Sequence, residues 1–325
     1  MPASRVVPCL VTVIAAAVLV AACSGTASPA PPGEARTTVV TTRGVAFEAE
    51  NPLSGAGVLD VFAPSEPGPW PVVVMFGGDR GSGETARLTL WASRVAELGF
   101  VVFVPTWGQS GGAAYDALPL HDQLVADAAQ SACAVEFARA TAAAYGGDPA
   151  SLILFGHSQG ANVASAIAFN LPAPTGGCLG GVDPRPVSAL VTYDGDWLLS
   201  SQPPAAVDAD PRLLDVLTPW TGLAAHPDLP VVMLSSAERL EGRAVSGISR
   251  AVLEPTGLGD ELEASGATAD GFLDNYEAQE LLCWALEAQG NLVTLTMLPG
   301  STHEDPGATG WPVLLDAFRV AVDLG

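Results

Sequence analysis

Residues 151–160 are Ser-Leu-Ile-Leu-Phe-Gly-His-Ser-Gln-Gly, a short apolar run that ends in the pattern G-x-S-x-G. The run has the length and composition of a buried strand, and the small residues at 161–170 favour a helix after it. Glycines at 156 and 160 permit a sharp turn between the two, because a side chain at either position would keep the helix away from the strand. Such a turn exposes the hydroxyl of Ser158 at the carboxyl edge of a sheet, which predicts a nucleophile.

The same five-residue pattern occurs once more, as Gly108-Gln109-Ser110-Gly111-Gly112. The residues that follow it, 113–119, show no helical face. A serine needs the strand, the turn and the helix together to be presented as a nucleophile. We therefore interpret the second match as a loop and retain Ser158 as the candidate.

Apolar runs alternate with helical patterns along most of the chain. Antiparallel edge strands are expected at 37–47 and 58–63, and later strands at 72–76, 100–105, 151–155, 189–193, 231–234 and 292–298. Helices are expected between them at 84–98, 122–145, 161–170 and 274–289, with a last one at 312–324. Continuous apolar strands separated by helices indicate the α/β class, with a mostly parallel sheet covered on both faces.

Two connections are much longer than the others, at 194–230 and 235–273. Long excursions at the carboxyl ends of strands build caps and substrate walls, so we expect cap-like insertions there. The sequence contains no internal repeat and gives no sign of a second domain. We therefore expect one domain over residues 37–325.

The first residues have the pattern of an export signal. Arg5 precedes an apolar run at 6–22, and the run ends in Val-Ala-Ala before Cys23. Small residues before a cysteine resemble a bacterial lipoprotein signal, in which that cysteine is lipidated; an ordinary signal peptide cut nearby is the alternative. Residues 1–22 are then a signal peptide, and 23–36, rich in serine, alanine and proline, a flexible tether. The protein is expected on the outer face of the cell membrane or secreted.

Charge and cysteines limit the partners. All 13 basic residues are arginine, and 35 acidic residues give a net charge of -22. This charge argues against nucleic acid or an anionic membrane surface as a partner, so membrane contact is expected only through the lipid anchor. The chain is expected to be a monomer.

After export, the preferred disulfide pair is Cys133 and Cys178, which lie before and after the turn at Ser158. No cysteine spacing indicates a metal site, and no cofactor is expected.

A serine hydroxyl needs a base to take its proton and a carboxylate to orient that base. The chain has four histidines. His157 lies inside the turn and is expected to pack beside the nucleophile, while His121 and His226 have ordinary structural interpretations. His303 ends the sequence Leu-Pro-Gly-Ser-Thr-His after the last strand, in a loop that returns to the edge that carries Ser158. It is the candidate base.

The turn at Ser158 and the late Pro-Gly-Ser-Thr-His loop together resemble the α/β-hydrolase fold, nearest to dienelactone-hydrolase-like and feruloyl-esterase-like serine esterases, over roughly residues 45–325. The family order of serine, acid and histidine implies Ser158 as nucleophile and His303 as base. The resemblance implies no metal and no organic cofactor.

The same resemblance places the acid in the loop after the strand at 231–234, where two candidates compete. Glu238 directly follows that strand and lies 65 residues before His303, whereas Asp270 lies 33 residues before it. The shorter separation resembles the family's unit of acid, helix, strand and histidine, so Asp270 is preferred and Glu238 is the alternative. Asp194 and Asp196, after the preceding strand, are more distant options.

The family also binds the negatively charged oxygen of the tetrahedral intermediate through two backbone amides. The resemblance implies those of Gln159 and Gly78. Phenylalanine stands at position 76, where the family usually has histidine, and Asp79 adds a carboxylate near that site. The expected function is cleavage of small-molecule or lipid-like carboxylic esters by a serine hydrolase. A binding module whose catalysis has lapsed, or a peptidase, are the alternatives.

Overall fold

The structure is a computed structural model that describes residues 37–49, 57–78, 85–108, 113–181, 183–195, 222–238 and 275–325, with short pieces at 212, 216, 243–244 and 272–273. The predicted signal peptide and tether, most of both predicted insertions, and Asp79, Asp196 and Asp270 lie outside these residues.

Eight strands form one sheet, in the order β1-β2-β4-β3-β5-β6-β7-β10. They are β1 (Val39–Ala46), β2 (Val58–Pro64), β3 (Trp70–Phe76), β4 (Val101–Pro105), β5 (Gly147–His157), β6 (Ala189–Tyr193), β7 (Val231–Ser236) and β10 (Val293–Leu298). β2 is antiparallel to both β1 and β4, and all other neighbours are parallel. This confirms the predicted mostly parallel sheet with an antiparallel edge. Two short strands, β8 (Arg243–Ala244) and β9 (Phe272–Leu273), pair separately.

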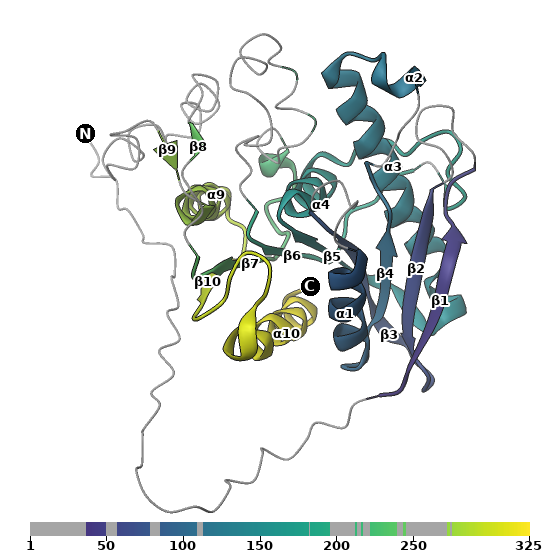
Figure 1. The fold of residues 1–325 in the computed structure, drawn as a ribbon, viewed down its shortest axis with the longest axis horizontal. Helices are drawn as coiled ribbons and strands as arrows, with labels where there is room; N and C mark the ends of the chain where they lie inside the picture. Colours follow the sequence, from purple (N-terminus) through teal and green to yellow (C-terminus); the bar gives the residue numbers. More distant parts are fainter. Residues whose placement is uncertain are drawn as a thin grey trace, which may run out of the picture.

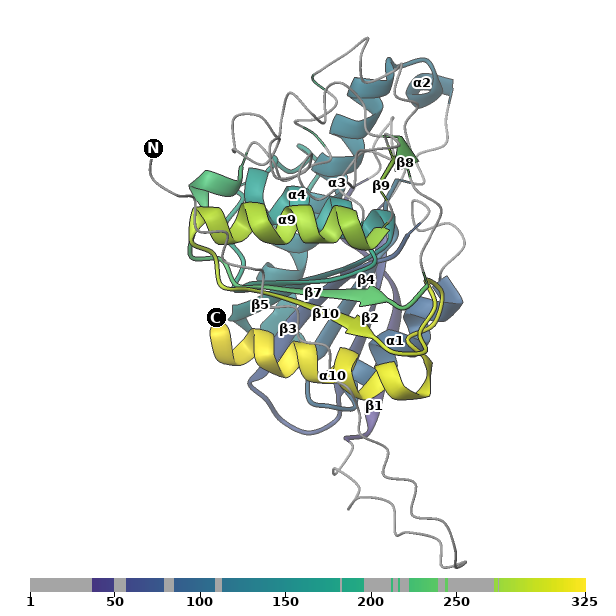
Figure 2. The same ribbon diagram turned by 90° about the vertical axis from the view of Figure 1, so that its left-hand side faces the viewer.

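Helices cover both faces of the sheet. Helices α3 (Leu120–Thr141), α4 (Gln159–Asn170) and α9 (Asn275–Gln289) lie on one face, and α1 (Thr85–Ala96) and α10 (Gly307–Leu324) on the other (Figures 1 and 2). A short 3-10 helix, η2 (Ala142–Tyr145), follows α3 directly. A second one, η3 (Leu223–Ala225), precedes β7. The central strands are buried on both sides, which is why their sequences are continuously apolar rather than alternating.

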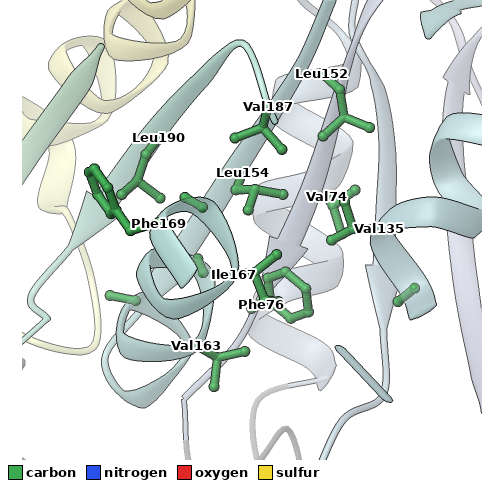
Figure 3. Close-up of a cluster of buried hydrophobic side chains, with 14 of the residues drawn as sticks. Val74, Phe76, Val135, Leu152, Leu154, Val163, Ile167, Phe169, Val187 and Leu190 are labelled. Atoms are coloured by element: carbon green, nitrogen blue, oxygen red, sulfur yellow. The ribbon is translucent and has the colours of Figure 1, made fainter. Parts of the chain in front are cut away.

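Each face has its own core. On the α3 and α4 face, Val74 and Leu154 of the sheet pack toward Val135, Val163 and Ile167 of the helices (Figure 3). On the other face, Trp91 of α1 and Phe318 of α10 belong to a second cluster with Phe155 of β5. Removing this much apolar surface from water supplies the main driving force for folding.

Among the described α-helices, two differ most from the sequence expectation. The last helix begins at Gly307 rather than at 312, so Pro312 lies inside it. A four-residue helix, α2 (Ala113–Asp116), follows the second G-x-S-x-G match, where none was expected. Ser110 itself lies outside the described residues.

A disulfide joins Cys133 of α3 to Cys178 in the loop after α4, with Cα atoms 5.3 Å apart, as predicted. Among the described helices, none has the length and apolar character required to span a bilayer.

Candidate active site

Ser158 occupies the turn between β5 and α4, with φ 54° and ψ -127°. A positive φ is unusual for a residue with a side chain and needs support from its surroundings. The Ser158 amide donates to the Tyr193 carbonyl at 2.9 Å, and its own carbonyl accepts from Ala161 at 2.9 Å. The turn therefore holds the serine in one conformation at the carboxyl edge of the sheet.

Both glycines of the motif are required sterically. A Cβ at position 156 would collide with the backbone of Gly160 and Ala161, which is the first turn of α4. A Cβ at position 160 would collide with the carbonyls of Phe76 and Gly77, at the end of β3. The reason proposed from the sequence, a close approach of helix and strand, is confirmed.

His303 lies against the serine. Its Nε2 is 2.9 Å from Ser158 Oγ, and its Nδ1 is 3.1 Å from Asp194 Oδ2. Because a carboxylate only accepts hydrogen bonds, Nδ1 carries a proton and Nε2 is left to accept one from the hydroxyl. The Asp194 side chain is fully buried, whereas that of His303 is 18% exposed. A buried carboxylate, an imidazole and a hydroxyl thus form one hydrogen-bonded chain.

Asp194 directly follows β6 and has φ 51°, a conformation that aspartate tolerates better than most residues. Its amide donates to Leu234 at 3.0 Å, and its Oδ1 accepts from the Ser236 amide at 2.7 Å. These contacts hold the carboxylate between β6 and β7 and leave Oδ2 for His303. Asp194 was the more distant option in the sequence analysis, and it is the carboxylate that contacts the imidazole.

Of the two acids favoured by the sequence, the structure describes only Glu238. Glu238 lies near, but its Oε2 accepts from the backbone amide of His303 at 2.8 Å, not from the ring. Asp270 lies outside the described residues. The resemblance placed the acid after β7, whereas the carboxylate on the ring is supplied one strand earlier in the sheet.

A buried aromatic group lies under His303. The His157 ring stacks on Tyr193, with centroids 5.5 Å apart, and lies 4.8 Å from the His303 ring. Burial, and then the nearby charge of Asp194, raise the pKa of the Tyr193 hydroxyl well above its ordinary value. His157 therefore packs beside the nucleophile, as expected. The His121 ring, in contrast, contacts Asp122 at the start of α3.

The segments that carry Gln159 and Gly78 are neighbours. The contact between position 160 and the end of β3 places the first turn of α4 against the loop that contains Gly78. The buried Trp107 indole donates to the Gly77 carbonyl at 3.0 Å and helps to hold that loop. Both candidate amides thus belong to segments anchored beside Ser158.

A cavity of about 320 Å³ lies at the opposite end of the sheet. It is bounded by the segments that precede β6 and β7, including Val187 and Leu229, and by the last residues of α10. Because Ser158 and His303 follow the carboxyl ends of their strands, this cavity is not part of the candidate active site.

No protein-family model matches this chain, and no curated protein matches its sequence. Solved structures do match its fold. A truncated carbohydrate esterase from gut microbiota has a TM-score of 0.59 at 15% identity, covering 90% of this chain and 99% of that one. Esterase B from Lactobacillus rhamnosis has a TM-score of 0.58 at 13% identity (88% and 86% covered). A thermophilic esterase from Thermogutta terrifontis, with propionate bound, has a TM-score of 0.53 at 18% identity (83% and 90% covered). This chain has the α/β-hydrolase fold of these esterases.

Proposed function

We propose that this protein is a serine hydrolase that cleaves carboxylic esters through an acyl-enzyme. The observation that carries the proposal is the chain Asp194–His303–Ser158, with contacts of 3.1 and 2.9 Å, at a turn that presents the serine in a single conformation. The esterases that share its fold support an ester as the substrate.

The reaction follows from the geometry. His303 Nε2 takes the Ser158 proton as Oγ attacks the ester carbonyl, and the amides of Gln159 and Gly78 bind the oxyanion that forms. Collapse of this intermediate breaks the bond to the alcohol, which leaves with the proton from Nε2. A water then attacks the acyl-enzyme and gives a proton to His303. The bond between the acyl carbon and Ser158 Oγ breaks as His303 returns that proton to Oγ, which releases the acid and the free serine. Asp194 keeps the ring oriented and stabilises its protonated form throughout.

The alternative of a binding module depended on an uncertain catalytic acid. The buried Asp194 carboxylate beside the His303 ring supports catalysis over that alternative.

Among esters, we expect short acyl chains to be the best substrates, because the Thermogutta terrifontis esterase was solved with propionate and with butyrate bound. A peptidase would use the same residues, so amides serve as the comparison substrate.

The test uses purified protein, a fluorophosphonate and a series of acyl esters of increasing chain length, with matching amides. We expect one phosphonyl adduct on Ser158, hydrolysis of short-chain esters above that of amides, and loss of both labelling and hydrolysis in Ser158→Ala. Ser110→Ala, in the second sequence match, is the matched control and keeps both. Hydrolysis that persists unchanged in Ser158→Ala would overturn the proposal.

We also propose that the protein is exported and anchored through lipid on Cys23. The disulfide between Cys133 and Cys178 supports an oxidising destination. In bacterial cells, the protein is expected in the membrane fraction and Cys23→Ala in the soluble exported fraction. Wild-type protein that stays in the cytoplasm would contradict export, and exported protein without lipid would contradict the anchor.

A further inference from the structure

The backbone that carries His303 is bound by side chains from neighbouring strands. The Tyr193 hydroxyl, at the end of β6, donates to the Thr302 carbonyl. The His157 Nε2, at the end of β5, lies 2.7 Å from the His303 carbonyl. A carbonyl only accepts, so this nitrogen carries a proton and donates it. Two successive carbonyls of the histidine loop are therefore held by buried donors.

Neither donor has room to move. His157 and Tyr193 are both fully buried, stack on each other, and meet Trp91 of α1 with centroid separations of 5.2 and 5.7 Å. The donors are enclosed, so leaving them unpaired is costly, while the accepting residues Thr302 and His303 reach the surface and the two hydrogen bonds are partly buried. A further hydrogen bond of this loop, donated by the His303 amide to Glu238 Oε2, is exposed and therefore weaker.

The same two residues also hold the nucleophile. His157 precedes Ser158 in the chain, and the Tyr193 carbonyl accepts the Ser158 amide at 2.9 Å. The two residues are paired in register between β5 and β6. Each therefore joins the nucleophile's backbone to the backbone of the base through one rigid aromatic side chain.

We propose that His157 and Tyr193 are positioning residues that set the distance between Ser158 Oγ and His303 Nε2. The proposal rests on the proposed function, since it assigns them to the same reaction. Both hydrogen bonds end on backbone carbonyls and not on the reacting atoms, although the His157 ring also packs against the His303 ring. Asp194 fixes the orientation of the imidazole, whereas His157 and Tyr193 fix where its backbone lies. Without them the loop shifts, and proton transfer from the serine slows while substrate binding is retained.

The test compares variants that keep or remove each donor. Tyr193→Phe removes one oxygen and keeps the ring. His157→Phe removes the donor and keeps an aromatic ring, while His157→Gln places an N–H near the position of Nε2. Tyr115→Phe is the matched control, because Tyr115 is also buried and its hydroxyl also makes a hydrogen bond, at 2.9 Å to Asp127. For each variant, kcat, KM and thermal unfolding are measured on one short-chain ester.

We expect Tyr193→Phe and His157→Phe to lose about tenfold in kcat, with KM changed by less than about twofold. His157→Gln recovers most of the loss, and Tyr115→Phe keeps its kcat although it loses a comparable hydrogen bond. Folded Tyr193→Phe with wild-type kcat would overturn the proposal. So would a kcat in His157→Gln as low as in His157→Phe, because packing alone would then explain the effect. Failure of the proposed function is distinguishable, since the wild-type protein would then neither hydrolyse esters nor bind the phosphonate at Ser158.

Discussion

The carboxylate of Asp194, directly after β6, contacts the ring of the candidate base, and strand register explains how it reaches that ring. β5 and β6 are parallel neighbours in which His157 pairs with Tyr193, so the next residues, Ser158 and Asp194, leave the sheet at the same level. Both have positive φ, 54° and 51°. Two matched turns on adjacent strands therefore bring the hydroxyl and the carboxylate to opposite sides of one imidazole.

The first prediction concerns Asp194→Asn. The amide keeps the size of the side chain but can donate toward Nδ1, which favours the wrong tautomer and removes the charge that stabilises protonated His303. We expect kcat on a short-chain ester to fall by about 10³-fold or more, with Ser158 still present and the protein folded. Glu238→Gln is the matched comparison, because its amide oxygen still accepts from the His303 backbone, and it should lose far less. If Glu238→Gln or Asp270→Asn lost as much as Asp194→Asn, the assignment of the acid would be wrong.

At the residue scale, the sequence predicted Ser158 and His303 because each has a local signature: glycines around the first and a strand-to-loop position for the second. The acid has no such signature. An aspartate after a buried strand is common, and the contact of Asp194 with the ring depends on the pairing of β5 with β6 and on a backbone turn that brings Oδ2 there. The separation along the chain, which favoured Asp270, carries none of that information.

At the element scale, the apolar runs predicted the strands well because strands buried on both faces leave little choice of residue. The predicted start of α10 was wrong, and tertiary contacts explain the difference. The sequence analysis placed the start at residue 312, whereas in the structure Pro312 lies inside the helix. In the structure Trp311 lies upstream of it, packed edge-on against Trp91 at 5.7 Å and under the Arg94 guanidinium at 4.1 Å. These contacts stabilise a longer helix that includes the proline.

The second prediction concerns the link between α3 and the loop after α4. The disulfide closes a loop between residues 45 apart, so its removal in Cys133→Ala/Cys178→Ala restores that freedom to the unfolded chain. Loop-closure entropy predicts a loss of about 4 kcal/mol in the free energy of unfolding. Because neither cysteine contacts Ser158, His303 or Asp194, kcat measured well below the unfolding temperature should be unchanged. Urea unfolding of both forms, without reductant, measures the first quantity. Equal stability of the two forms would contradict the prediction.

At the scale of the whole molecule, the alternation of strands and helices predicted the fold class and the covering of both faces of the sheet, because both features follow from which residues must be buried. Burial alone does not determine the order of the strands in the sheet. This order depends on how the crossovers run, and the sequence indicated it only through the resemblance to α/β-hydrolases. Strand order nevertheless decides which carboxylate reaches the candidate base, because β6 lies beside β5 and so brings Asp194 to the His303 ring.

The last prediction uses a property of the entire chain, which has four tyrosines and no lysine. Between pH 10 and 12 tyrosines therefore dominate its titration. Burial and the charge of Asp194 raise the pKa of Tyr193 above the unfolded value of 10.0, so the folded state keeps this proton where the unfolded state releases it. The Tyr193 hydroxyl therefore does not change the free energy of unfolding below pH 10. As pH rises above 10, this one group lowers that free energy by at most about 1.4 kcal/mol per pH unit. Tyr193→Phe lacks the group and should lose stability less steeply across the same range. Urea unfolding at pH 9, 10, 11 and 12 measures the slopes, and equal slopes for wild type and Tyr193→Phe would show that this hydroxyl does not hold its proton in the folded protein.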